Sequence, residues 1–287
     1  MAGPYRGHCW TFSAQGGRHT PARMREPLVM GIVNVTPDSF SDGGEFLEPA
    51  RAIAHGRRLA EEGAAYLDIG GESSRPGAEP VPADEELRRV LPVIEGLAGV
   101  DAVISVDTTK RVVAEAALEA GARMVNDISA FRFDPELAGL VADTGAECCL
   151  MHMLGDPRTM QQDPRYDDVV SEVRAFLEER LAFAVAEGVP EEKVWLDPGI
   201  GFGKTVEHNL ELLRRLDELV AIGRPVLVGT SRKSFIGKIT GRAEKERVAG
   251  TIASNVLAYV GGARMFRVHD VREAVDALAV AAATVGA

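Results

Sequence analysis

Short apolar runs alternate along the chain with longer stretches in which apolar residues recur every three or four positions. The short runs are too continuous for half-exposed strands, so they predict strands that are buried on both faces. The longer stretches predict amphipathic helices that pack on these strands. The eight predicted strands cover residues 28–33, 65–69, 102–106, 123–127, 147–152, 194–198, 225–229 and 263–269. The eight predicted helices cover residues 49–62, 83–97, 111–120, 135–144, 167–187, 206–220, 245–260 and 271–284.

The alternation of strand and helix predicts an α/β fold with a parallel sheet, because each strand has to be reached by a helical crossover. Eight such units favour a closed (β/α)₈ TIM barrel over an open doubly wound sheet. We therefore expect residues 28–287 to form one barrel, preceded by an N-terminal extension of residues 1–27. Within that extension, Cys9–Phe12 and the glycines that follow predict a small hairpin that covers one end of the core.

Acceptor side chains stand at or near the ends of several predicted strands, namely at Asp107, Asn126 and Asp197. In a (β/α)₈ barrel the loops after the strands share one face, where active sites are built. Acceptors that converge there suit a heterocycle carrying an amino group next to a ring N–H. A single Mg²⁺ shared with substrate phosphate oxygens remains compatible with the same residues. For Asp127 we favour the simpler interpretation of a helix N-cap.

Basic residues follow other strands on the same predicted face, although the net charge of the chain is −11. They are Arg75, Arg232, Lys233, Arg267 and His269. Several cations on one face of an acidic protein predict a local anion site. Arg267 and His269 belong to the last strand, near which barrels often bind phosphate. We expect this pair to form a sub-site that lies away from the acidic residues.

Composition restricts the class of protein further. A chain of 287 residues that is 46% hydrophobic and 26% charged is typical of a soluble globular protein. The negative net charge argues against a nucleic-acid partner, and no apolar run reaches the ~20 residues that span a bilayer. The three cysteines, Cys9, Cys148 and Cys149, form no CxxC pair and no disulfide framework, which indicates a reducing cytoplasm.

The glycine-rich segment Gly199-Ile-Gly-Phe-Gly-Lys-Thr205 is similar to a phosphate-binding loop but fails its spacing. Pro198 stands where a P-loop requires glycine, and the third glycine comes one residue early for a Rossmann fingerprint. We favour a loop that allows close backbone approach after the sixth strand. For His152 we expect a packing role, and for Met151 a place in the wall beside a flat ligand.

These motifs together resemble the dihydropteroate synthase family of pterin-binding (β/α)₈ barrels. The segment Met30–Gly44, with the sequence MGIVNVTPDSFSDGG, and the segment Asp68–Ala78, with the sequence DIGGESSRPGA, are the most specific matches. The resemblance extends from about residue 28 to the end of the chain. Further matching segments are residues 105–108, 126–129, 151–153, 196–204, 228–235 and 267–270.

The resemblance implies a role for each matching residue. It implies that the pterin is bound by Asp107, Asn126, Met151, Asp197, Gly229 and Lys233. It implies that the pyrophosphate is bound by Asn34, Ser74, Arg267 and His269, with Asn34 also a ligand of Mg²⁺. It implies a 4-aminobenzoate pocket made by Phe40, Ser74, Arg75, Pro76, Phe202, Lys233 and Ser234. Catalysis would depend on Asn34, Asp107, Lys233, Arg267 and His269. Ser74 stands where the family often has threonine and keeps the hydroxyl.

The reaction implied is the condensation of dihydropterin-CH₂-pyrophosphate with 4-aminobenzoate, which gives dihydropteroate for folate biosynthesis. No protein nucleophile is required, so we expect a dissociative displacement by the arylamine. The resemblance also implies a homodimer and a sulfonamide target. Two other classes remain open, which are a pterin-dependent methyltransferase that serves a corrinoid and a catalytically silent relative that only binds.

Overall fold

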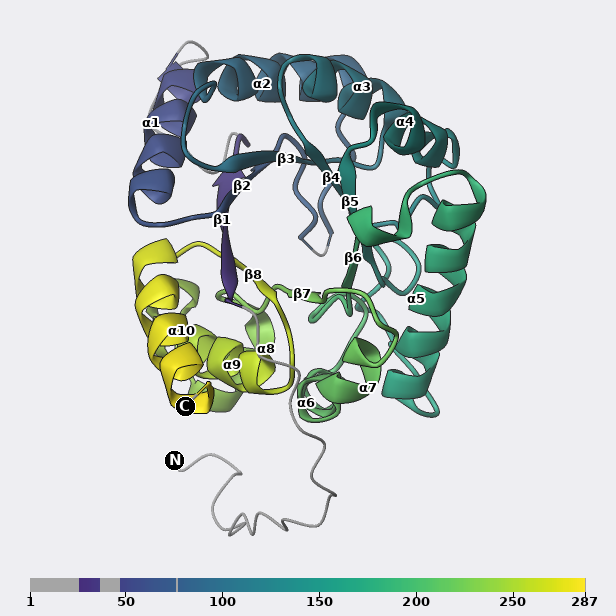
Figure 1. Cartoon of the computed structure of the whole chain (residues 1–287). Helices are drawn as coiled ribbons and strands as arrows, with labels where there is room; N and C mark the ends of the chain where they lie inside the picture. Colours follow the sequence, from purple (N-terminus) through teal and green to yellow (C-terminus); the bar gives the residue numbers. More distant parts are fainter. Residues whose placement is uncertain (1–25, 37–46, 76, 287) are drawn as a thin grey trace, which may run out of the picture.

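Eight parallel strands form the centre of the computed structural model, which describes residues 26–36, 47–75 and 77–286 (Figure 1). The strands are β1 (Leu28–Asn34), β2 (Tyr66–Gly70), β3 (Val103–Asp107), β4 (Met124–Asp127), β5 (Glu147–Met151), β6 (Val194–Asp197), β7 (Leu227–Val228) and β8 (Met265–Val268). They lie in the order β6-β5-β4-β3-β2-β1-β8-β7, and a parallel bridge between Leu196 and Val226 joins β6 to β7. The sheet therefore closes into a nearly complete barrel, and the predicted fold class is confirmed.

The helices form a ring around the strands (Figure 1). They are α1 (Leu47–Glu61), α2 (Ala83–Gly96), α3 (Arg111–Glu119), α4 (Glu136–Thr144), α5 (Val169–Ala186), α6 (Val206–Arg214), α7 (Leu216–Val220), α8 (Ser234–Thr240), α9 (Val248–Val260) and α10 (Val271–Val285), with short 3₁₀ turns η2 (Glu191–Lys193) and η3 (Glu244–Glu246). In the described part of the chain, no helix is both long and apolar enough to cross a membrane.

Two helical predictions need correction. The predicted helix over residues 206–220 is divided into α6 and α7, because Arg215 leaves the helical conformation with φ −109° and ψ 32°. The division still buries Leu212 and Leu216 completely. The helix α8 was not predicted, since its short glycine-containing sequence has no long apolar period, but Phe235 and Ile236 anchor it in the core. The predicted N-terminal hairpin lies outside the described residues.

The interior of the barrel is divided into an apolar and a polar layer by the two-residue period of the strands. One apolar cluster inside the barrel consists of Met30, Tyr66, Met124, Cys149, Trp195, Leu227 and Met265. Two positions further along, five of these strands carry Asp68, Asn126, Met151, Asp197 and Arg267, and Gly229 directly follows β7. Side chains that differ by two positions in a strand point to the same face. The strands therefore place an apolar floor inside the barrel and a largely polar layer above it, at their carboxyl ends.

Candidate active site

Asp68 is the centre of the polar layer, although the sequence did not single it out as a site residue. Its side chain is completely buried on β2 and accepts hydrogen bonds from Ser105 Oγ at 2.6 Å and Asn126 Nδ2 at 3.0 Å. It also accepts one from Arg267 Nε at 2.6 Å. A charge inside a fully buried strand has to be paired. That rule was the signal that could have identified Asp68 from the sequence.

Arg267 joins two carboxylates. Besides the bond to Asp68, its Nη2 donates to Asp107 Oδ2 at 2.9 Å. The prediction that Arg267 lies away from the acidic residues is therefore wrong. The reason is that β8 pairs with β1, which pairs with β2, so the long side chain of Arg267 reaches the inward residues of β2 and β3. Burial and the neighbouring Asp68 carboxylate raise the pKa of Asp107, and the attraction of Arg267 opposes that shift.

The three residues predicted to hold the ring each keep one acceptor atom unused by the described residues. Asp107 uses Oδ2 for Arg267, Asn126 uses Nδ2 for Asp68, and Asp197 uses Oδ1 to accept from the backbone N–H of Gly199 at 2.7 Å. Asp107 Oδ1, Asn126 Oδ1 and Asp197 Oδ2 accept no hydrogen bond within the described chain. Three acceptors at the ends of β3, β4 and β6 remain for a ligand with several N–H donors.

Lys233 lies in the loop between β7 and α8, near enough to Asp197 for the two charges to act on each other. Its ammonium donates to the carbonyl oxygen of Ile200 and lies 4.5 Å from the ring centroid of Phe202. Burial lowers the pKa of Lys233 to about 8, although the Asp197 carboxylate opposes that shift. An ideal Cβ on Gly229 would stand 3.8 Å from Arg267 Cβ and 3.9 Å from Lys233 Nζ. The missing side chain at Gly229 therefore leaves the space between the two cations open.

The arginines of the predicted anion site are already paired with carboxylates. Arg75 is exposed and forms a 3.0 Å ion pair with Glu244, and Arg232 Nε donates to Asp270 Oδ2 at 3.0 Å. The charges of Arg75, Arg232 and Arg267 nevertheless all act on His269, so the anion site formed by these residues stays a prediction. The Arg232–Asp270 pair also ties the loop after β7 to the loop after β8. For an anion, the Nη1 of Arg267 is the guanidinium nitrogen that the carboxylates leave unused in the described structure.

His269 follows β8 and contacts Ser231 in the loop after β7. Its Nδ1 lies 2.9 Å from Ser231 Oγ, and its backbone N–H donates to that hydroxyl at 3.1 Å. Burial, followed by the charges of Arg232 and Arg267, lowers the pKa of His269 to about 3. The ring is therefore neutral at pH 7, and the arginine charges that act on it outweigh the opposing Asp270 carboxylate, which is a suitable environment for an anion.

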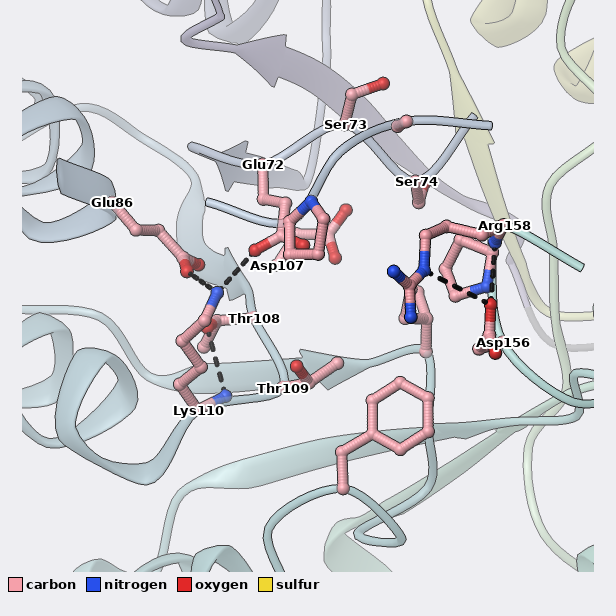
Figure 2. A pocket seen from close by; sticks show the side chains of 15 residues that line it. Glu72, Ser73, Ser74, Glu86, Asp107, Thr108, Thr109, Lys110, Asp156 and Arg158 are labelled. Atoms are coloured by element: carbon pink, nitrogen blue, oxygen red, sulfur yellow. Dashed lines mark hydrogen bonds and ion pairs between the residues drawn. The ribbon is translucent and has the colours of Figure 1, made fainter. Parts of the chain in front are cut away.

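Beside Asp107 lies a cavity of about 320 Å³ that is lined by the loops after β2, β3, β4 and β5 (Figure 2). At one end the ammonium of Lys110 lies between Glu72 and the buried Glu86. At the other end Ser74 and Arg158 face the cavity (Figure 2). Ser74 is thus on the predicted functional face, within a space that adjoins the acceptor cluster.

The remaining predicted residues also lie at the carboxyl ends of the strands, where they are described. Met151 ends β5 and packs with Met153, Met160, Ile128 and Phe202. Ser234 is the exposed first residue of α8. Phe40 and Pro76 lie outside the described residues.

Asn34 is half-buried at the end of β1, in register with Gly70 on β2. Among the described residues, no three His, Cys, Asp or Glu side chains form a metal-binding group. A lone amide oxygen fits Mg²⁺ that keeps most of its coordination for water and substrate oxygens.

The helix-cap interpretation of Asp127 is wrong. Its carboxylate accepts from the backbone N–H groups of Ser129 and Phe131, both at 2.7 Å, and α4 begins only at Glu136. Ala130 and Phe131 have φ of 53° and 62°, so this carboxylate stabilises a turn with an unfavourable backbone. Burial raises the pKa of Asp127 to about 6. The packing role expected for His152 is confirmed, because its buried ring lies edge-to-face on Phe176.

Comparison with known proteins identifies the class of enzyme to which this barrel and its polar strand ends belong. Residues 30–269 match the family described as pterin binding enzyme. The dihydropteroate synthase of Escherichia coli (strain K12) is 46% identical over 275 residues, which cover 96% of this chain and 96% of that protein. The chain therefore belongs to the pterin-binding enzymes and, among them, to the dihydropteroate synthase family.

Solved structures of this family are similar to this chain over most of its length. The Xanthomonas albilineans dihydropteroate synthase with 4-aminobenzoic acid has a TM-score of 0.87 and 52% identity, covering 92% of this chain and 95% of that chain. The Yersinia pestis dihydropteroate synthase, in a complex with a sulfonamide drug, has a TM-score of 0.87 and 46% identity. It covers 91% of this chain and 95% of that chain.

Proposed function

We propose that the chain condenses 6-hydroxymethyl-7,8-dihydropterin pyrophosphate with 4-aminobenzoate, which gives 7,8-dihydropteroate and pyrophosphate in folate biosynthesis. The observation that carries the proposal is the row of unused acceptors on Asp107, Asn126 and Asp197, with the ammonium of Lys233 near Asp197. A pterin presents an amino group and ring N–H donors on one edge and a ring carbonyl as acceptor. The row and the ammonium complement both kinds of group.

Ring binding and charge stabilisation use the same residues. Asp107 and Asp197 accept from the pterin N–H groups, while Lys233 donates to a ring acceptor. When the bond to the leaving pyrophosphate lengthens, positive charge develops on the methylene carbon and the pterin ring. The fixed carboxylates stabilise that charge because they need no reorganisation inside a buried site. The arylamine nitrogen then attacks the methylene carbon and loses a proton.

The leaving pyrophosphate is held by Arg267, His269, Ser74 and Asn34. Arg267 contributes its unused Nη1, and the neutral ring of His269 donates one hydrogen bond. Asn34 would also hold Mg²⁺, which, when bound, supplies positive charge to offset the charge of the departing pyrophosphate. Because Arg267 also bonds to Asp68 and Asp107, it couples the leaving group to the ring-binding carboxylates.

The 4-aminobenzoate pocket lies on the Lys233 side of the mouth. Phe202 provides an aromatic wall, and Lys233 and Ser234 provide polar groups for the carboxylate end. Ser74 and Arg75 border the site from the loop after β2. The sulfonamide complex of the Yersinia pestis relative supports a pocket of this kind, so we expect sulfonamides to compete with 4-aminobenzoate.

The test is formation of dihydropteroate by the purified full chain, measured with and without added Mg²⁺. Turnover that requires 4-aminobenzoate and Mg²⁺ supports the proposal. Pterin binding without turnover would instead identify a silent relative. Methyl transfer to a corrinoid acceptor without dihydropteroate formation would identify the methyltransferase alternative.

We further propose a cytoplasmic homodimer. Leu257 and Val260 of α9 and Val280 of α10 are 61%, 56% and 67% exposed on neighbouring helices, and such exposed apolar side chains suit contact with a second copy. Cys148 and Cys149 are buried free thiols, which suits a reducing compartment. Light scattering would test the dimer, and a monomer at micromolar concentration would contradict it. Cell fractionation would test the location.

A further inference from the structure

A second buried lysine lies beside the site and has no part in the chemistry described above. Lys204 is only 3% exposed, and its ammonium donates to the Phe202 carbonyl at 3.0 Å. Its Nζ also lies 2.9 Å from His152 Nδ1. Both of these partners are neutral. Burying an ammonium that bonds to no carboxylate is costly, and burial lowers the pKa of Lys204 well below its usual value, although the nearby Asp197 carboxylate opposes that shift. The burial of Lys204 therefore needs a structural or functional explanation.

His152 gives Lys204 a fixed attachment on the neighbouring strand. It directly follows β5, and its backbone N–H donates to the Asp197 carbonyl at 2.9 Å. Its ring lies edge-to-face on Phe176, with the centroids 4.8 Å apart. Burial, followed by the charge of Lys204, lowers the pKa of His152 to about 2, so the ring is neutral. A neutral ring held in this way accepts from Lys204 through Nδ1.

The loop that carries Lys204 is pressed against the chain after β5. Gly199 has φ 66°, and an ideal Cβ there would stand 1.8 Å from the His152 carbonyl oxygen, so only glycine allows this approach. The same loop contacts Lys233 at two points, through the Ile200 carbonyl and the Phe202 ring. Lys204 thus fixes a loop whose other side faces the proposed 4-aminobenzoate pocket.

Each carbonyl in this part of the loop has its own side-chain donor. Gln161 donates to the Gly201 carbonyl, Tyr166 donates to the Gly203 carbonyl at 2.8 Å, and Lys204 donates to the Phe202 carbonyl. Loss of Lys204 would leave the other two anchors in place. The loop would stay attached, but the Phe202 peptide and ring would be free to turn.

We propose that Lys204 is a positioning residue that joins the Phe202 carbonyl to His152 and thereby orients the Phe202 wall of the 4-aminobenzoate pocket against Lys233. This inference rests on the proposed function. It predicts that Lys204 affects the arylamine substrate more than the pterin substrate. Asp107 and Asn126 lie on β3 and β4, and Asp197 accepts from this loop only at Gly199, to which Lys204 does not bond.

Steady-state kinetics of Lys204→Met test the inference, since methionine fills the space without donating. Loss of the hydrogen bonds that Lys204 makes should raise KM for 4-aminobenzoate by about tenfold, with kcat and the pterin KM changed by less than about threefold. His152→Asn keeps an acceptor at the δ position, so its KM for 4-aminobenzoate should stay near the wild-type value. His152→Leu lacks that acceptor and should show the same rise in KM as Lys204→Met. Lys193→Met, at the opposite end of β6, is the matched control.

An unchanged KM for 4-aminobenzoate in Lys204→Met, or equal losses for both substrates, would overturn the inference. If Lys204→Met does not fold, the comparison of His152→Asn with His152→Leu decides in the same way. The proposed function fails separately, through the absence of turnover in the wild-type chain. In that case amide hydrogen exchange over residues 199–204 still tests the bridge, because faster exchange is expected in His152→Leu and unchanged exchange would contradict it.

Discussion

The substitution Asp68→Asn tests whether the polar layer is held together by one buried carboxylate. Asparagine keeps the shape but removes the charge, and its amide group places N–H donors against the donors of Arg267 and Asn126. Breaking one partner of a buried ion pair costs about 3–5 kcal/mol. Arg267 keeps its bond to Asp107 at 2.9 Å, so we expect the lower end, about 3 kcal/mol.

Calorimetry and urea denaturation of the ligand-free protein provide the measurement. About 3 kcal/mol corresponds to a fall in Tm of roughly 6–12 °C for a domain of this size. Ser105→Ala should have a smaller effect of about 1–2 kcal/mol, because it removes one hydroxyl donor and leaves the charge paired. Asp101→Asn, an exposed aspartate before β3, is the matched control and should change stability by less than about 0.5 kcal/mol. If Asp68→Asn is as stable as the wild type, Asp68 does not organise the layer.

Three further predictions concern the ligands. Asp197→Asn should weaken pterin binding by about 1.5–3 kcal/mol, and an unchanged affinity in titration calorimetry would remove Asp197 from the ring site. Affinity for the pterin should fall as pH rises through about 8, where Lys233 loses its proton. The contribution of Lys233 to folding stability should increase from pH 8 towards 10.5, because only the unfolded chain keeps the proton there. In Lys233→Met, these changes of pterin affinity and of folding stability with pH should both vanish. Arg267→Ala should weaken binding of the free pterin and of the pyrophosphate substrate, whereas His269→Ala should affect only the latter, and identical profiles would disprove the bridging role of Arg267.

Local patterns were sufficient to predict the barrel and the face that carries the site. Continuous apolar runs identify buried strands, and their alternation with helices requires parallel pairing. The two-residue period of a strand then fixes that Tyr66 and Asp68, or Trp195 and Asp197, point to the same side. Because these are properties of neighbouring residues, they can be predicted without the tertiary structure.

The contacts between distant strands were decided only by closure of the barrel. Arg267 bonds to Asp68 across 199 positions in sequence, and no local pattern indicates that the last strand lies near the second. The sequence therefore placed Arg267 apart from the acidic residues, and closure placed it among them. Lys204 and His152, which are 52 positions apart, meet because β5 and β6 pair directly and the loop after β6 folds back on the chain after β5. Strand period sets the direction of a side chain, but its partner depends on the order of strands around the barrel, which is a property of the whole chain.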